Sequence, residues 1–154
     1  MLYRTFMIIA FITLASLAFA ARPAHAAARA IGNPLRIVAY DYAAAQSGKS
    51  YCRGGTGPSC YDCSGLVWAA YQHAHIWLGR TTYDMLASGR LIRIGHAQAR
   101  RGDLAFYGTG HVELFDGGDT TFGAHDAGSR IGLIQFSSSW EPTAYYRVEG
   151  PDST

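Results

Sequence analysis

Apolar residues in the first half of the chain recur at intervals of three and four residues, the spacing of amphipathic helices. One helix is predicted to begin after Asn33-Pro34, which suit the N-cap and the first helical position. It is predicted to end near Ser47-Gly48. Its apolar face is formed by Leu35, Val38, Tyr42 and Ala45.

A second helix is predicted from Asp62 to about His73, with Asp62 as its N-cap. Apolar residues recur along it at one-turn spacing: Leu66, Val67, Ala70 and Tyr71. The sequence Thr81-x-x-Asp84 matches a capping box and predicts a short third helix that stops at Gly89.

After Gly89 the pattern changes to short segments with a period of two, which predicts strands separated by turns. The predicted strands are 91–94, 103–107, 111–115, 120–125, 131–136 and 145–148. Helices followed by strands with short connections indicate an α+β domain, with N-terminal helices packed on a five- to six-stranded antiparallel sheet.

The N-terminus carries Arg4 followed by the apolar stretch 6–20 and two small-x-small sites. This pattern predicts a secretory signal peptide over residues 1–26, cleaved after Ala26, and a single domain over residues 27–154. The alternative is a membrane anchor, but the apolar stretch is shorter than the roughly 20 residues that span a bilayer. We therefore expect no stable membrane anchor once the signal peptide is removed.

Removal of the signal peptide also changes the charge of the chain. The full sequence has 13 basic and 11 acidic residues, and residues 1–26 contain Arg4, Arg22 and no acid. The remaining domain is therefore formally neutral. Neutrality argues against nucleic-acid binding and against electrostatic attachment to a membrane. Together with the predicted signal peptide, we expect a protein that is secreted, periplasmic or associated with the cell wall. We also expect a monomer.

The chain has three cysteines, an odd number for an exported protein. We expect a disulfide between Cys52 and Cys60, which would close a short loop and leave Cys63 free. The alternative is a three-cysteine metal site, but paired C-x-x-C sequences are missing. No metal and no organic cofactor are expected.

Cys63 opens the second predicted helix, beside unpaired backbone N–H groups and the positive end of the helix dipole. Both features stabilise a thiolate, which is the nucleophilic form of cysteine. A cysteine nucleophile also needs a base to take its proton and return it to the leaving group. His111 is one candidate, because it follows Gly108-Thr109-Gly110 at the start of an apolar strand; His125 ends the next strand.

The turn of the predicted hairpin decides whether the two histidines can cooperate. A regular two-residue turn places His111 opposite Ala124, with His125 on the other face of the sheet. A three-residue turn or one bulge places His111 opposite His125, and glycines 117, 118 and 123 permit either irregularity. The functional interpretation requires the second arrangement; otherwise the two are unrelated surface histidines.

Several motifs together resemble the NlpC-type cell-wall peptidases of the NlpC/P-sixty superfamily. They are Gly48-Lys49-Ser50-Tyr51-x-x-Gly54-Gly55, Asp62-Cys63-Ser64-Gly65-Leu66-Val67, Arg80-Thr81, Arg101-Gly102-Asp103-Leu104 and Gly110-His111-Val112. Their order and spacing agree over about residues 34–148. The resemblance implies a papain-like fold and a cysteine endopeptidase that cuts peptidoglycan stem peptides, commonly between γ-linked D-glutamate and diaminopimelate or lysine.

The resemblance also implies roles for individual residues. Cys63 matches the nucleophile, His111 the general base, and His125 the polar residue that orients the His111 ring. Three further matches imply contacts near the nucleophile or with substrate: Tyr51, Asp62 and Ser64. The sequence leaves core packing open for Tyr51 and a purely structural helix cap open for Asp62.

Glu113 departs from the family pattern, which commonly has a small residue two positions after the histidine. Strand alternation places Glu113 on the same face as His111, where it could raise the histidine pKa or contact a cationic substrate group. The leading hypothesis is a secreted peptidoglycan endopeptidase with a Cys-His-His thiol mechanism. The alternatives are an amidase or acyltransferase on the same scaffold, and a catalytically silent wall-binding module.

Overall fold

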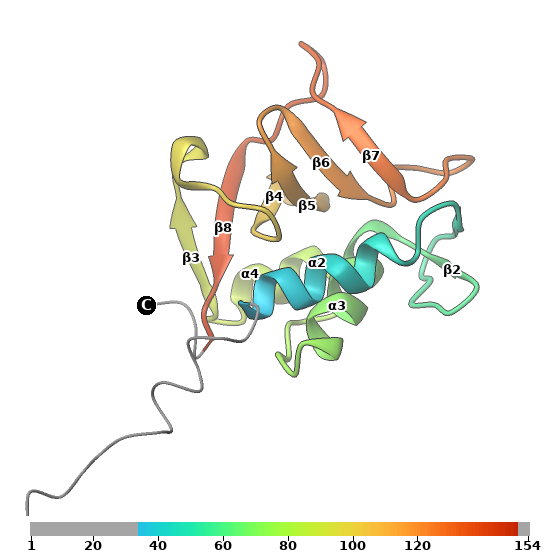
Figure 1. Cartoon of the computed structure of the whole chain (residues 1–154), viewed down its shortest axis with the longest axis horizontal. Helices are drawn as coiled ribbons and strands as arrows, with labels where there is room; N and C mark the ends of the chain where they lie inside the picture. Colours follow the sequence, from blue (N-terminus) through green and yellow to red (C-terminus); the bar gives the residue numbers. More distant parts are fainter. Residues whose placement is uncertain (1–33, 151–154) are drawn as a thin grey trace, which may run out of the picture. The chain divides into compact units, whose positions relative to one another are not determined.

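The computed structural model describes residues 34–150, so the predicted signal peptide lies outside the described residues. The described part of the chain contains three α-helices and a six-stranded sheet (Figure 1). No helix between residues 34 and 150 is long and apolar enough to cross a membrane.

Helix α2 (Leu35–Ala44) begins after Pro34, close to its predicted start. Its most deeply buried residues are Ala39, Tyr40 and Ala43. The predicted face is therefore rotated from the observed one: Leu35, Val38 and Tyr42 are only half-buried against the core, and Ala45 is exposed beyond the last turn. The spacing predicted the helix correctly, but the face that is buried most deeply carries Ala39, Tyr40 and Ala43.

Helices α3 (Cys63–His73) and α4 (Thr82–Ala87) begin where their caps predict. The Asp62 carboxylate accepts a hydrogen bond of 2.6 Å from the backbone N–H of Gly65. Thr81 and Asp84 form the predicted capping box. These two caps satisfy backbone donors that have no partner within the helices.

The six strands form one antiparallel sheet in the order β3-β8-β4-β5-β6-β7. Their bounds are β3 Leu91–Ile94, β4 Leu104–Tyr107, β5 His111–Gly117, β6 Thr120–Gly123, β7 Gly132–Gln135 and β8 Ala144–Val148. The sheet and its strands confirm the predicted architecture. A parallel pair, β1 (Ser50–Tyr51) with β2 (Cys60–Tyr61), was not predicted, because two-residue strands carry no readable period.

Helices α2 and α3 pack on one face of the sheet, over β5 and β6 (Figure 1). Val112 and Leu114 of β5 point into the core shared with these helices. His111 and Glu113 alternate with them and therefore lie on the other face. His111 is the first residue of β5, so its ring can reach the helix from the end of the strand.

The β5–β6 hairpin contains a bulge. Leu114 pairs with Phe122, but Gly117 pairs with Thr120, which leaves Asp116 as the extra residue. Gly117 has a φ of 132°, a conformation that residues with a side chain rarely adopt. Extended along the strands, this register sets His111 opposite His125, which is the arrangement that the functional interpretation requires.

The predicted disulfide is present between Cys52 and Cys60, whose Cα atoms are 5.6 Å apart, and Cys63 is free. The disulfide loop passes close to the first turn of α3. A Cβ atom built on Gly65 would lie 2.0 Å from the carbonyl oxygen of Gly55. Only glycine at position 65 therefore allows the loop and the helix to approach this closely.

Candidate active site

Cys63 is the first residue of α3, with its thiol half-buried at the positive end of the helix. Burial raises the pKa of this thiol, but hydrogen bonds with His111 and with the backbone N–H groups of Val112 and Ser64 outweigh that effect. The net pKa of Cys63 is lowered. The geometry therefore favours a thiolate, as expected for a nucleophilic cysteine.

Asp62 holds the start of α3 in place. One carboxylate oxygen accepts from Gly65, and the other accepts from the Gly54 N–H and from Arg80 Nη2, both at 2.8 Å. Arg80 also donates to the buried Ser64 hydroxyl at 3.0 Å. The polar groups of Asp62 and Ser64 are thus used inside the protein, and their predicted contacts with substrate remain predictions.

Tyr51 is half-buried at the end of β1 and packs against the main core. Burial and then the nearby Cys63 charge raise the pKa of Tyr51, which keeps its hydroxyl protonated. Tyr51 therefore lies close enough to Cys63 for the charge of the thiolate to affect its pKa. A contact between this hydroxyl and substrate is still a prediction.

His111 faces two partners. Its Nε2 lies 2.8 Å from Oε1 of Glu113, so Nδ1 is the nitrogen available to Cys63. Burial lowers the pKa of His111, but hydrogen bonds with Cys63 and Glu113 outweigh it and raise the pKa to about 9. His111 is therefore placed to take the thiol proton and to keep it at neutral pH.

His125 lies beside His111, with 5.9 Å between the ring centroids. Its Nδ1 is 3.2 Å from Oε1 of Glu113, the same oxygen that His111 contacts. The structure brings all three predicted catalytic side chains into one neighbourhood. The two imidazoles, however, meet through the Glu113 carboxylate.

Three residues of this site have no counterpart among the sequence predictions: Tyr107, Thr121 and Trp140. The Tyr107 hydroxyl lies 3.1 Å from Oε2 of Glu113, and the Thr121 hydroxyl also donates to that oxygen. Strand alternation could have placed Tyr107 and Thr121 on the His111 face, since they occupy neighbouring strands.

Trp140 covers the histidine pair from the segment before β8. Its ring centroid lies 4.4 Å from that of His125 and 5.2 Å from that of His111, and it stacks on Tyr107 at 4.5 Å. The indole shields both imidazoles from water on that side. No sequence signal indicated this contact, because Trp140 lies in the connection between β7 and β8, where no periodicity predicts the direction of a side chain.

His111, Glu113 and His125 also resemble a set of metal ligands, because one donor atom of each lies within 4.8 Å of the others. Two imidazoles and a carboxylate can bind zinc. In this structure both imidazole nitrogens are within hydrogen-bond distance of the same glutamate oxygen, which accounts for the cluster without an ion.

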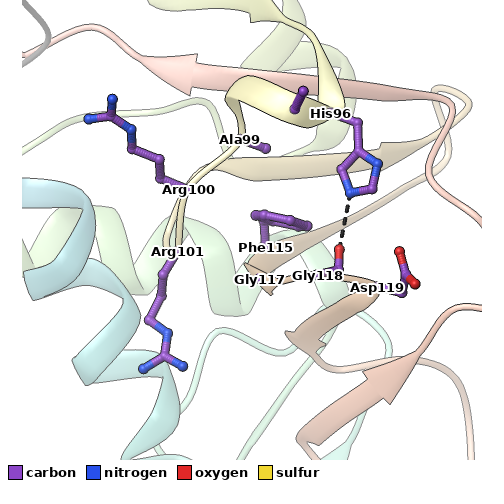
Figure 2. Close-up of a pocket in the computed structure, with 9 residues that line it drawn as sticks. His96, Ala99, Arg100, Arg101, Phe115, Gly117, Gly118 and Asp119 are labelled. Atoms are coloured by element: carbon purple, nitrogen blue, oxygen red, sulfur yellow. Dashed lines mark hydrogen bonds between the residues drawn. The ribbon is translucent and has the colours of Figure 1, made fainter.

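A separate concavity lies at the other end of β5, away from His111. Figure 2 shows His96 reaching across it, with Nε2 3.0 Å from the carbonyl oxygen of Gly118. Phe115 lines the concavity, and Arg101 at its rim pairs with Asp116. It contains none of the predicted catalytic residues.

Comparison with known proteins identifies relatives of this chain. The chain is 39% identical over 97 residues to "Probable endopeptidase p60" of Listeria monocytogenes, covering 60% of this chain and 19% of that protein. It is 35% identical over 122 residues to a probable endopeptidase of Corynebacterium glutamicum, covering 78% of this chain and 56% of that protein. The chain thus spans only about a fifth of the length of the Listeria relative.

Among solved structures, the peptidoglycan hydrolase RipB of Mycobacterium tuberculosis superposes with a TM-score of 0.65 at 26% identity, covering 84% of this chain and 70% of RipB. An NLP/P60-family lipoprotein-like protein of Staphylococcus aureus superposes with a TM-score of 0.66 at 28% identity, covering 77% of this chain and 43% of that protein. These matches confirm the papain-like α+β fold. A model of the NlpC/P60 family matches residues 48–148, and the chain therefore belongs to that family.

Proposed function

We propose that the chain is an exported cysteine endopeptidase that hydrolyses amide bonds in the stem peptides of peptidoglycan. The observation that carries the proposal is the Cys63–His111 pair. It combines a thiol of lowered pKa at a helix N-terminus with a histidine whose pKa is raised to about 9. The names of the relatives, endopeptidases and a peptidoglycan hydrolase, support the reaction class.

The mechanism follows from the positions of these groups. Nδ1 of His111 takes the Cys63 proton, and the thiolate attacks the carbonyl carbon of the scissile amide. In the proposed mechanism the backbone N–H of Cys63, in the first turn of α3, stabilises the oxyanion. His111 then protonates the leaving amine and afterwards activates the water that hydrolyses the thioester.

The finer assignments belong to the same proposal. The bond is that between γ-linked D-glutamate and diaminopimelate or lysine, and the chain reaches the wall through a signal peptide over residues 1–26. Tyr51 contributes a hydroxyl beside the thiol. The reaction uses no cofactor, since a thiol and an imidazole supply both the nucleophile and the proton transfers.

Digestion of purified muropeptides, followed by mass spectrometry of the products, tests this function. Wild-type enzyme should release fragments that end in D-glutamate, and Cys63→Ala should release none while remaining folded. Ser47→Ala, an exposed substitution of similar size, is the control and should retain activity.

The products also separate the alternatives. An amidase would release intact stem peptides from muramic acid, and an acyltransferase would give condensed peptides. A silent binding module would release nothing and would not react with a cysteine-protease inhibitor. More than a few per cent of wild-type activity in Cys63→Ala would refute Cys63 as the nucleophile.

A further inference from the structure

We propose that Glu113 is the positioning residue for His111, and that the buried Glu113 carboxylate is hydrogen-bonded to both His111 and His125. This inference rests on the proposed function, because it assumes that His111 is the acid–base residue. It changes the role of His125, which would support Glu113 and would not orient the His111 ring directly.

The contacts of Glu113 carry the argument. Its side chain has no exposed surface. Oε1 lies within hydrogen-bond distance of Nε2 of His111 and Nδ1 of His125, and Oε2 is bonded by the hydroxyls of Tyr107 and Thr121. Four contacts surround the two oxygens, which is the full capacity of an ionised carboxylate.

An ionised carboxylate only accepts hydrogen bonds, so each ring nitrogen that faces Glu113 must carry a hydrogen. For His111 this fixes the neutral form with the hydrogen on Nε2. Nδ1 is then unprotonated and faces Cys63. Glu113 thereby selects the tautomer that can act as a base, which a neutral neighbour such as His125 could not enforce.

The carboxylate also favours the charged form of His111. When Nδ1 takes the Cys63 proton, the resulting imidazolium lies 2.8 Å from Glu113 in a site screened by Trp140. Burial raises the pKa of Glu113, but hydrogen bonds with His111, Thr121 and His125 outweigh it and the pKa is lowered. The other titratable groups near His111 are Cys63, His125 and Tyr107, and Tyr51 lies beside the thiol.

The surrounding chain leaves space for this carboxylate. By the register of the hairpin, position 123 lies opposite Glu113, and it is a glycine. Thr121, two residues earlier on the same strand, presents its hydroxyl to Oε2, and Tyr107 does so from β4. Three strands therefore contribute to one carboxylate site, which is the support expected of a group that must hold a catalytic ring in place.

Titration of His111 in NMR spectra of histidine-labelled protein tests the proposal. In wild-type protein the ring should titrate near pH 9 and, above that pH, carry its hydrogen on Nε2. Glu113→Gln keeps the side-chain size and should lower the His111 titration by about one to three pH units, the usual effect of losing a close opposite charge. The matched control is Glu149→Gln, which removes the same charge from an exposed site and should leave the titration unchanged.

The same variants should show the effect in catalysis. In Glu113→Gln the alkaline limb of the kcat/KM pH profile should move to lower pH. In Glu113→Asp, which keeps a carboxylate, the limb should lie between its positions in Glu113→Gln and in wild type. A His111 titration in Glu113→Gln within a few tenths of a pH unit of wild type would overturn the proposal. Because the titration needs no substrate, this result is distinct from a failure of the peptidoglycan assay, which would refute only the proposed function.

If Glu113→Gln does not fold, a measurement on the wild-type chain replaces it. The chain has three glutamates, and Glu141 and Glu149 are exposed, so their carboxyl carbon signals can be assigned by substitution and Glu113 by elimination. The Glu113 signal should show no step near pH 4.5, the ordinary glutamate value, and one step near pH 9, when His111 loses its proton. A step near pH 4.5, and none near pH 9, would overturn the proposal.

Discussion

Gly123 leaves the space that the Glu113 side chain occupies. A Cβ atom built on Gly123 would lie 2.6 Å from Cγ of Glu113, closer than real Cβ atoms come to any neighbour. The glycine has no unusual backbone angle, so its role is to provide room and not conformational freedom. Packing at this cross-strand position therefore affects the position of the His111 ring, because that ring is hydrogen-bonded to Glu113.

Gly123→Ala should therefore reduce both stability and activity. The added methyl group must displace Glu113 or the strand, at a cost of about 1–3 kcal/mol in the free energy of unfolding, as for other overpacked sites. Urea denaturation and kcat/KM on muropeptides measure the two effects. Gly132→Ala in β7, where a Cβ atom finds 4.0 Å of space, is the matched control and should change neither by much.

Activity should depend on pH with an alkaline limit near 9. The reactive state, thiolate with imidazolium, exists between the lowered pKa of Cys63 and the His111 pKa of about 9. Below this window the thiolate is protonated, and above it His111 has no proton to give to the leaving amine. A pH profile of kcat/KM checks the limits; an alkaline limb near 6.5, the ordinary histidine value, would contradict them.

The same pKa predicts a pH effect on folding. Because the pKa of His111 is higher in the folded state than the ordinary 6.5, its contribution to stability is complete below that value. The contribution is lost as the pH rises through about 9. Urea unfolding between pH 6 and 10 measures it, and His111→Gln should remove this component of the pH dependence.

The two histidines should differ in how much activity they contribute. His111→Ala should remove nearly all hydrolysis, because His111 is the side chain that is hydrogen-bonded to the Cys63 thiol and takes its proton. His125→Ala should reduce kcat by about 10- to 1,000-fold, because His125 does not transfer the proton itself. The control is His73→Ala, which alters an exposed histidine at the end of α3. Equal losses in both site variants would show that His125 takes part in proton transfer.

Arg80 should matter for the position of the nucleophile. It joins Asp62, Ser64 and the Gly55 carbonyl, so Arg80→Met leaves the Asp62 carboxylate without its cation. We expect a loss of about 1–3 kcal/mol in the free energy of unfolding and slower alkylation of Cys63 by iodoacetamide. Arg90→Met, at an exposed arginine, is the control. Wild-type alkylation in Arg80→Met would show that the first turn of α3 needs no such support.

Residues whose role depends on local sequence were predicted well. The caps Asp62 and Thr81, the disulfide and the free Cys63 all follow from neighbours within a few positions of the chain. The strands followed from a period of two. The buried face of α2 was predicted only approximately, because apolar residues occur on more than one side of this helix and their spacing did not single out Ala39, Tyr40 and Ala43.

The interior of the site was harder to predict, because it depends on register. Whether His125 faces His111 depends on a single extra residue, Asp116, and the glycines that follow it, 117, 118 and 123, allowed more than one register. The position of the Trp140 ring beside the histidines could not be predicted, because it depends on the path of the chain before β8. Glu113 was placed on the correct face, but its bond with His125 needed the register as well.

The bulge at Asp116 has a consequence for how this protein can vary over evolution. Asp116 is held in place by the hydroxyl of Tyr40 in α2 and by Arg101 in the loop before β4, both remote from the thiol. An insertion or deletion of one residue between Leu114 and Phe122 would exchange the faces of every later residue in β6 and carry His125 away from Glu113. Related sequences should therefore conserve the length of this hairpin more strictly than the identity of its exposed residues, and changes at Tyr40 or Arg101 should be accompanied by changes at Asp116.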